Sequence, residues 1–526
     1  MRSIPFRTLT ENEWLFPTDT VGTPENEITL DAARGGNVLF QILTDEVLAA
    51  PAPFTMTLAG ANGVTVTPYR LAAVNVPKNS GPRGQASLAK SYEDVADFVT
   101  KKAPFDVYDI TEEIGDTLAE GKLAYAVRIE VAPNAPVGAE SILIVLSAGD
   151  AAVTVKVTLN IHKAVIPALR DSRLIVCNWI YPDHIVAGHG VEAYSEEYYA
   201  ILRKYMLHLV DIRSNHFSMM GSDMLVGGFP IRDEGGRIVD FDFSVFERHL
   251  RMADEVGFTA LYGPYIAHWG TPSDDNLYLL WDREVAVTER EGYRQLSIYL
   301  KRLREMIERN GWEKKYIQPL VDEPQVPNER PYRILAAIFR RFMPGYLVHD
   351  PLETTDVGGG PDIWCIKQAV FEKYIDIYRE YQAMGEKFTF YTCGHPMGDH
   401  INRVLDLPLV VGRLGFWMCY RYGLLGFLHW GYHAYADRKK TLCVGPAGNQ
   451  CIVYPDGDGL VDTVRSHGQR AGAEDWELFA MLYKLDAARA DALLARGCRT
   501  FTDYERSGTA VDAIHRELLL ALDEYL

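Results

Sequence analysis

Apolar positions in the first 165 residues fall in short runs that alternate with polar positions, for example NVLFQIL, YAVRIEV and AVTVKVTLNI. A period of two is typical of strands that bury one face, and no long stretch of helical period separates the runs. We therefore predict an N-terminal antiparallel β-sandwich over residues 1–165. The charged stretch 80–122 interrupts this pattern and is expected to be an excursion that contains one short helix.

From about residue 172 apolar runs alternate with amphipathic stretches of helical period, such as EEYYAILRKYMLHL and YRQLSIYLKRLREMIERNG. Eight strands alternating with helices predict a (β/α)8 TIM-like barrel over residues 172–486. An open doubly wound sheet usually has fewer strands, and no Gly-rich phosphate loop follows the first run. The predicted strands are LIVCNWI (174–180), DIRSNHF (211–217), FTALYG (258–263), YIQPLV (316–321), YLVHD (346–350), DIWCI (362–366), FTFYTC (388–393) and LGFLHW (425–430).

Residues 487–526 contain the amphipathic segment VDAIHRELLLALDEYL and are predicted to form a C-terminal helical extension packed on the barrel. A short apolar run, CIVYP, precedes them and is expected to be a strand. The chain is thus interpreted as a multidomain β plus α/β protein.

The charge balance excludes some classes of partner. The 526 residues include 53 Lys and Arg against 71 Asp and Glu, a net charge of −18, which disfavours binding to nucleic acid. No apolar run reaches the ~18 residues of a membrane span. The start, MRSIPFRTLTENEW, lacks the apolar core of a signal peptide, so a cytoplasmic protein is expected unless a leader has been removed. The 7 cysteines are scattered without a CxxC pair, which favours reduced thiols.

Chemistry in a barrel of this kind lies at the C-terminal ends of the strands. The predicted strand ends are rich in aromatic side chains, whose faces stack on the apolar faces of sugar rings. This composition indicates a carbohydrate site, and Trp430, Tyr391 and Trp364 are expected to form its aromatic wall. Packing in the barrel core is the alternative for Trp364 and for Trp430. The predicted substrate-binding residues are Trp430, Tyr391, Trp364, Trp179, His395, His429, Asn215 and Tyr265.

The motif VDEP at 321–324 places two adjacent carboxyls and a proline at the end of an apolar strand. Hydrolysis of a glycoside needs an acid for the leaving oxygen and a second group that stabilises the developing positive charge. Adjacent strand residues point to opposite faces, so both can reach one substrate only where the strand loses its regularity, just before Pro324. We predict Glu323 and Asp322 as the catalytic pair. The alternative is that Asp322 caps the loop and Glu323 is solvated.

A metal site is the competing hypothesis, because four histidines fall between residues 395 and 433: His395, His400, His429 and His433. The i, i+4 spacing of the last two aligns ligands only on a helix, whereas LHWGYH is typical of a strand that enters a turn. The sequence contains no HExxH motif. It also lacks the GxSxG motif that would indicate a serine nucleophile. We expect neither a metal nor a cofactor.

Several segments together resemble glycoside hydrolase family 123 and the catalytic domains grouped with it. They are the entry strand with Trp179, YSEEYYAILRKYMLHLVDIRSNHF, VDEP, DIWCIK, YTCGHPMGDHINRVLDLPLVVGRLGFWMCYRYGLLGFLHWGYHAY and CIVYPDGDG. The resemblance implies a retaining exo-glycosidase that acts on β-linked N-acetylhexosaminides, with N-acetylgalactosamine favoured, by substrate-assisted catalysis. It also implies that Glu323 is the general acid/base and that Asp322 orients the 2-acetamido group of the substrate.

Two other functions remain open from the sequence. The same barrel could hydrolyse a sugar without an acetamido group, which requires a second carboxylate some ~5 Å or more from Glu323. Asp350 or Glu353, after strand five, could supply that carboxylate. A non-catalytic carbohydrate-binding or scaffold protein is the third hypothesis, and it would tolerate Glu323→Gln without loss of function.

Overall fold

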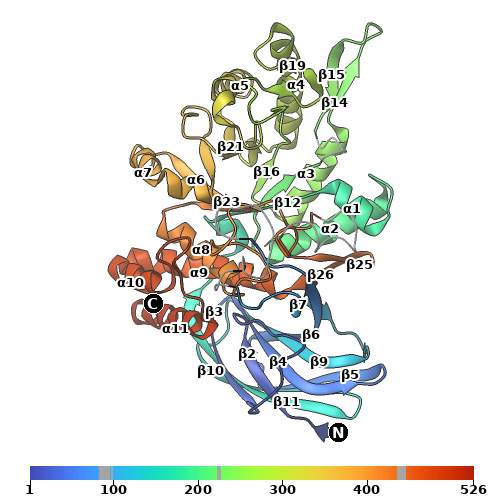
Figure 1. Ribbon diagram of the computed structural model, residues 1–526, viewed down its shortest axis with the longest axis vertical. Coiled ribbons are helices and arrows are strands. Elements are labelled where there is room, and N and C mark those ends of the chain that lie inside the picture. Colours follow the sequence, from blue (N-terminus) through green and yellow to red (C-terminus); the bar gives the residue numbers. More distant parts are fainter. Residues whose placement is uncertain (82–94, 96–98, 222–226, 435–445) are drawn as a thin grey trace.

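The computed structural model describes residues 1–81, 95, 99–221, 227–434 and 446–526 (Figure 1). The short helix expected between residues 80 and 122 falls largely on residues 82–94 and 96–98, which lie outside the described part. The six cysteines within the described part are free thiols. Within that part, no helix is both long enough and apolar enough to cross a bilayer.

The N-terminal region consists of two mainly antiparallel sheets packed face to face, which confirms the predicted sandwich. Their shared core contains Phe40 and Val127 from one sheet and Ile144 and Val155 from the other. The first sheet has the order β1 (Arg2–Ser3), β11 (Ala151–Val165), β10 (Gly138–Ala148), β5 (Ala52–Ala59), β8 (Thr117–Leu118), with β3 (Glu27–Arg34) also paired to β11. The second has the order β2 (Phe6–Thr10), β4 (Asn37–Leu48), β9 (Gly121–Val131), β6 (Val64–Val76), β7 (Phe105–Glu113), β26 (Gly459–Thr463), β25 (Tyr454–Asp456).

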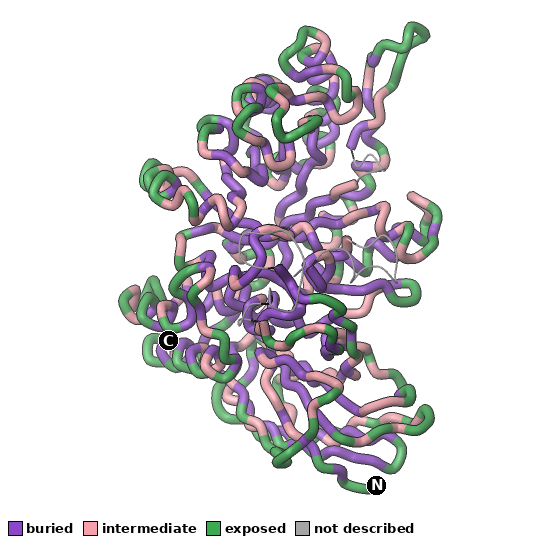
Figure 2. Tube along the Cα trace, in the orientation of Figure 1, coloured by how far each residue is buried: buried purple, intermediate pink, exposed green. Residues whose placement is uncertain are grey.

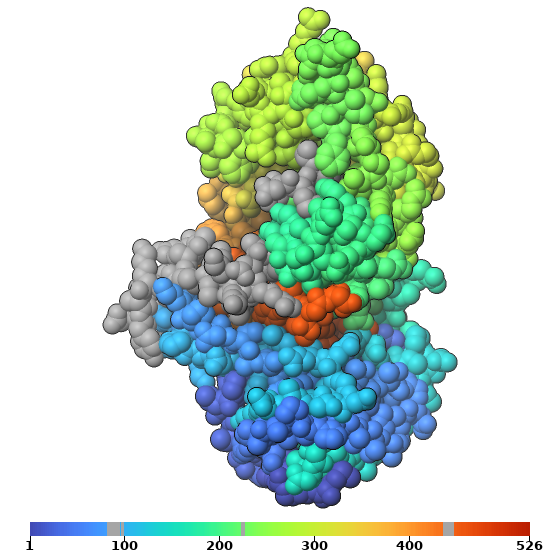
Figure 3. Space-filling model, turned by 90° about the vertical axis from the view of Figure 1, so that its right-hand side faces the viewer, coloured from blue at the N-terminus to red at the C-terminus, as the bar shows by residue number. Residues whose placement is uncertain are grey.

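The hairpin β25–β26 comes from the far end of the chain yet extends the N-terminal sheet. Asp462 and Thr463 of β26 pair with Thr111 and Ile110 of β7. The apolar run CIVYP predicted a strand here, but it contains no signal for the partner. In Figure 3 the orange-red part of the chain lies between the blue sandwich and the green barrel helices. A hairpin that follows the last barrel strand in the sequence therefore completes a sheet of the sandwich.

Eight parallel strands form a closed barrel, which confirms the predicted (β/α)8 architecture. Each predicted run overlaps an observed strand, and the last strand pairs with the first. The strands are buried along most of their length (Figure 2). In order they are β12 (Ile175–Ile180), β13 (His216–Met219), β16 (Ala260–Tyr262), β20 (Tyr316–Gln318), β21 (Leu347–Leu352), β22 (Ile363–Lys367), β23 (Lys387–Thr392) and β24 (Gly426–His429).

Helices follow the strands and cover the outside of the barrel. They are α1 (Pro182–His189), α2 (Glu196–Asp211), α3 (Ser244–Val256), α4 (Arg290–Asn310), α5 (Glu329–Phe342), α6 (Gln368–Lys373), α7 (Ile375–Ala383), α8 (Val411–Arg421) and α9 (Val464–Leu485). Two excursions carry short strands, the hairpin β14 (Phe229–Arg232) with β15 (Ile238–Asp242), and β17 (Ala267–His268) with β18 (Tyr278–Leu279) and β19 (Asp282–Ala286). The terminal helices α10 (Ala487–Gly497) and α11 (Gly508–Tyr525) contact α9, and α11 also contacts β3 and β11 of the sandwich.

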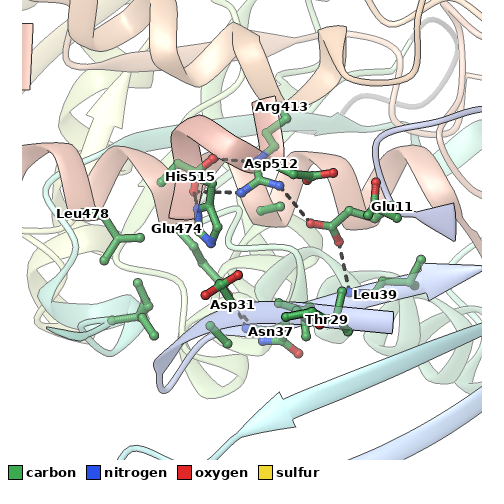
Figure 4. A pocket seen from close by; sticks show the side chains of 18 residues that line it. Glu11, Thr29, Asp31, Asn37, Leu39, Arg413, Glu474, Leu478, Asp512 and His515 are labelled. Atoms are coloured by element: carbon green, nitrogen blue, oxygen red, sulfur yellow. Dashed lines mark hydrogen bonds and ion pairs between the residues drawn. The ribbon is translucent and has the colours of Figure 1, made fainter. Parts of the chain in front are cut away.

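A buried ionic cluster joins α8, α9, α11 and the sandwich around a small cavity (Figure 4). The guanidinium of Arg413 pairs with both oxygens of Asp475, at 2.5 and 3.0 Å, and donates to Glu11 at 3.0 Å. His515 of α11 lies 2.7 Å from the same Asp475 carboxylate. Arg413 and His515 hold the pKa of Asp475 well below its usual range, whereas burial raises that of Glu11 to about 8.

Replacing Arg413 by Met is expected to lower the free energy of unfolding by about 3–5 kcal/mol, because the buried Asp475 carboxylate loses its guanidinium partner and Glu11 loses a hydrogen-bond donor. Urea unfolding followed by tryptophan fluorescence measures this loss. The exposed pair of Arg489 with Glu524, 2.6 Å apart, supplies the control, because Arg489→Met should cost far less. Equal unfolding midpoints for the two variants would show that the cluster does not hold the domains together.

Candidate active site

The Asp322–Glu323 pair lies where the fourth barrel strand ends. The regular part of β20 stops at Gln318, and Glu323 has a left-handed backbone with φ 43°. This departure from strand geometry lets neighbouring side chains reach the same space. Asp322 Oδ1 accepts a hydrogen bond from the Tyr265 hydroxyl at 3.0 Å, and Glu323 Oε1 accepts one from the hydroxyl of Tyr391 on β23. Both carboxyls thus face the interior at the carboxyl end of the barrel.

Asp350 fixes this irregular end of the strand. Its Oδ1 accepts from the backbone amides of Leu320 at 2.6 Å and Val321 at 3.4 Å, and its Oδ2 accepts from the Tyr332 hydroxyl at 2.7 Å. The carboxyl is fully buried, and burial raises its pKa to about 8. Because both of its oxygens are bonded to the scaffold, Asp350 holds the end of strand four in place.

The charged part of the site also contains the carboxyl of Glu353 and the ammonium of Lys367. Lys367, the last residue of β22, bonds Glu353 and lies 3.7 Å from Glu323 Oε1. Burial, reinforced by the neighbouring Glu323, raises the pKa of Asp322 to about 7. Burial and Glu353 also raise the pKa of Glu323, against the opposing effect of Lys367. The site is therefore built to retain protons near neutral pH.

Four of the predicted aromatic residues meet above the barrel. Trp179, Tyr265, Tyr391 and Trp430 belong to one apolar cluster that also includes inward residues such as Cys365. Trp179 and Tyr265 pack edge to face, with ring centroids 6.3 Å apart. Trp430 is the most accessible of the four, because the other three are buried. Contact between the half-buried Trp430 ring and a sugar stays a prediction.

A cavity of about 250 Å³ lies beside Asp322. Its walls are largely apolar, and Asp322 is the acidic residue among them. The indole of Trp269, another lining residue, donates to the backbone carbonyl of Asp322 at 2.8 Å. The lining residues are Met219, Met220, Gly221, Pro264, Tyr265, Ala267, His268, Trp269, Leu280 and Asp322.

Trp364 does not line the site, and its predicted role in the aromatic wall is wrong. Strand β22 places Cys365 in the interior cluster, so Trp364 points outward. Its side chain is only 1% exposed, packs on Tyr381 with ring centroids 5.4 Å apart, and donates to Glu386 at 3.0 Å. Trp364 belongs to the layer between the barrel and α7.

The predicted substrate-binding roles of Asn215 and His429 are also wrong, because neither side chain points into the site. Asn215 precedes β13, and its side chain bonds the backbone of Val176 and Leu174 at 2.9 and 2.8 Å, so it lies at the amino end of the barrel. His429 is buried, accepts from the Gly431 amide at 2.8 Å, and is on the opposite side of β24 from the inward Leu428. Burial lowers the pKa of His429 well below its usual value.

His395 lies half-buried in the loop after β23, and its carbonyl accepts from the Cys393 thiol at 3.1 Å. Its contact with a sugar stays a prediction. Among residues 1–81, 95, 99–221, 227–434 and 446–526, no group of three or more His, Cys, Asp or Glu side chains is arranged to hold a metal ion.

Two residues of the site, Lys367 and Trp269, are not among the predicted catalytic or substrate-binding residues. Lys367 directly follows the apolar run DIWCI, so its place at the mouth of the barrel is evident from the sequence, whereas its partners on other strands are not. Trp269 lies in an irregular segment several residues beyond β16, where no sequence pattern marks it.

Replacing Trp430 by Ala is expected to raise KM about tenfold, because the predicted stacking face for the sugar is lost, and to lower the unfolding midpoint less than the loss of a fully buried ring would. Trp364→Ala is the matched control and should instead lower the free energy of unfolding by about 3–5 kcal/mol. Steady-state kinetics and thermal unfolding of both variants measure the contrast. A stability loss without a change in KM for Trp430→Ala would assign that residue to the core.

A solved structure shares the fold of this chain. Solved structures similar to the chain include a family 123 glycoside hydrolase from Clostridium perfringens, at 13% identity and a TM-score of 0.72, with 99% of this chain and 97% of that chain covered. A β-glucuronidase from Dictyoglomus thermophilum matches at 12% identity and a TM-score of 0.35, over 91% of this chain and 98% of that chain. No curated protein matches the chain.

The family model for the glycoside hydrolase 123 catalytic domain matches residues 179–482. This range covers more than half of the chain and includes the barrel strands from β13 to β24, the catalytic pair candidates and most of α9. The chain therefore belongs to the glycoside hydrolase 123 family, and it is a glycosidase whose substrate is a carbohydrate.

Proposed function

We propose that this protein is a retaining exo-glycosidase that removes β-linked N-acetylhexosamine, with N-acetylgalactosamine favoured, by substrate-assisted catalysis. The observation that supports this most strongly is the adjacent pair Asp322 and Glu323, turned into the barrel with a cavity beside Asp322. A substrate that supplies its own nucleophile needs one acid/base and one group that holds the acetamide.

In the first step the acetamido carbonyl oxygen of the substrate attacks its own anomeric carbon while the glycosidic bond breaks. Glu323 transfers its proton to the leaving oxygen, and a cyclic oxazolinium forms. Ionised Asp322 accepts the acetamide N–H and stabilises the positive charge that develops on that nitrogen. The hydrogen bond from Tyr265 keeps Asp322 in the required orientation.

In the second step water attacks the anomeric carbon from the face that the leaving group vacated. Glu323, now a carboxylate, takes a proton from that water, and the oxazolinium reopens to the acetamide. Two inversions at one carbon give overall retention of configuration.

The cavity beside Asp322 supports recognition of an acetamido group. Its apolar walls suit a methyl group, and the Asp322 carboxyl at its edge suits an amide N–H. The Clostridium perfringens neighbour is described in terms of glycolipid glycan hydrolysis, which makes glycolipid glycans natural compounds to test.

Hydrolysis of a sugar without an acetamido group would need a protein nucleophile. Of the two carboxyls considered for it, Asp350 is committed to the backbone of strand four, and Glu353 is bonded to Lys367. These bonds favour the substrate-assisted mechanism.

A panel of chromogenic glycosides tests the proposal. Wild type should cleave β-N-acetylgalactosaminide, and β-N-acetylglucosaminide more slowly, and should leave the β-galactoside and β-glucoside intact. Asp322→Asn, at equal folded concentration, distinguishes this activity from a contaminant, because its expected loss of activity does not depend on the leaving group. Cleavage of the β-galactoside at a rate equal to that of its acetamido counterpart would contradict the proposal.

A further inference from the structure

We infer that Lys367 is a movable counter-ion for Glu323, held by Glu353 while Glu323 carries its proton and turning to the Glu323 carboxylate once that proton has left. Lys367 and Glu353 are thus positioning residues that act through the acid/base. The inference deepens the proposed function and rests on the role of Glu323 in it.

The geometry places one ammonium between two carboxyls. Lys367 ends β22, Glu353 follows β21, and these neighbouring strands bring the two side chains into contact. The Lys367 ammonium lies 3.7 Å from Glu323 Oε1, longer than a hydrogen bond and short enough for a small side-chain rotation to close. The side chain of Lys367 is 11% exposed, so solvent screens the pair weakly.

The ionisable groups that face Glu323 come from three further strands and from its own segment. Within this set Lys367 is the cation, and burial together with Glu353 and Asp322 disfavours a charge on Glu323. The Tyr391 hydroxyl donates to Glu323 and therefore favours the carboxylate. The groups are Asp322, Glu353, Cys365, Lys367, Tyr391 and Cys393.

The charge of Glu323 changes twice in the reaction. Each change alters which of the two carboxyls, Glu323 or Glu353, attracts the Lys367 ammonium more strongly. When the Glu323 proton passes to the glycosidic oxygen, a carboxylate appears 3.7 Å from the ammonium, which then pairs with it. When that carboxylate takes a proton from the attacking water, it becomes neutral again and Glu353 regains the ammonium. Glu353 therefore prevents a permanent ion pair that would make Glu323 too weak a base.

Two variants should shift the alkaline limb of the kcat/KM profile in opposite directions. Lys367→Met removes the cation, so the pKa of Glu323 rises and the limb moves up by about one pH unit. Glu353→Gln releases Lys367 to Glu323, so the pKa falls and the limb moves down by about one pH unit. Lys367→Arg keeps the charge and should restore most of the wild-type profile. A structural role alone would lower activity in both variants without opposite shifts.

The leaving group gives a second kinetic readout. A weaker acid in Lys367→Met should slow cleavage of alkyl glycosides about tenfold more than cleavage of dinitrophenyl glycosides, which need little protonation. Lys156→Met and Glu27→Gln are matched controls, because that exposed pair in the sandwich, 3.0 Å apart, carries the same charges far from the barrel mouth. Neither control should shift the profile.

A titration that needs no substrate separates this inference from the proposed function. Infrared spectra of each variant are recorded with and without the additional substitution Glu323→Gln. The difference between the two spectra follows the ionisation of the Glu323 carboxyl as pH rises. Opposite shifts in these spectra without cleavage of any N-acetylhexosaminide would overturn the proposed function and leave the charge relation intact. Shifts in one direction for both variants, or none, would overturn the inference.

Discussion

Replacing Glu323 by Gln is expected to lower kcat/KM on an alkyl-linked N-acetylhexosaminide about a thousandfold, within the range of general acid–base catalysis. The amide has no proton to transfer to the leaving oxygen, while the side chain keeps its volume. A dinitrophenyl glycoside needs little protonation, so its first step should stay near the wild-type rate. Steady-state and burst kinetics on the two substrates measure this difference.

Glu313→Gln is the control for this variant. Glu313 is exposed just before β20, so the same substitution there acts on the opposite end of the strand and should leave both substrates unaffected. An equal loss on alkyl and dinitrophenyl substrates for Glu323→Gln would show that Glu323 is not the proton donor.

Asp322→Asn is expected to lower kcat about 10²- to 10³-fold while KM changes little. Asn still accepts the acetamide N–H, so the substrate binds, but the amide cannot stabilise the positive charge of the oxazolinium. A large rise in KM with kcat retained would assign Asp322 to ground-state binding instead.

The pH dependence follows from the shared protons of the pair. Asp322 must be ionised, so activity is lost as pH falls through the pKa of Asp322. Glu323 must be protonated, so activity is lost as pH rises through the pKa of Glu323. Repulsion separates the two steps and gives a bell-shaped profile. Because Glu323 helps to raise the pKa of Asp322 to about 7, Glu323→Gln should move the acid limb, measured with the dinitrophenyl glycoside, to lower pH.

The barrel and the position of Asp322 and Glu323 at its mouth can be predicted from the sequence, because each depends on local patterns. The apolar run YIQPLV followed by two acids and a proline marks the end of a strand by itself. The resemblance to a known family then agreed with that motif. The roles of Asp350 and Lys367 depend on contacts between neighbouring strands, which no local pattern shows.

The errors have a common physical origin in register and strand limits. Trp364 was assigned to the wall by its place near a strand end, but a shift of one residue moves a side chain to the opposite face. Asn215 was misplaced because α2 continues to Asp211 and Arg213 turns with φ 62°, so β13 starts at His216. Pairing of β26 with β7 was equally beyond the sequence, since nothing in CIVYP identifies a partner so distant along the chain.

Inhibition by a thiazoline analogue of the cyclised intermediate tests substrate-assisted catalysis most directly. We expect competitive inhibition of wild type with Ki at least about a hundredfold below KM for the matching glycoside, because the analogue resembles the species that Asp322 stabilises. Inhibition of Asp322→Asn should be weaker. Absence of inhibition, together with a covalent glycosyl adduct on a carboxylate such as Glu353 detected by mass spectrometry, would contradict substrate-assisted catalysis.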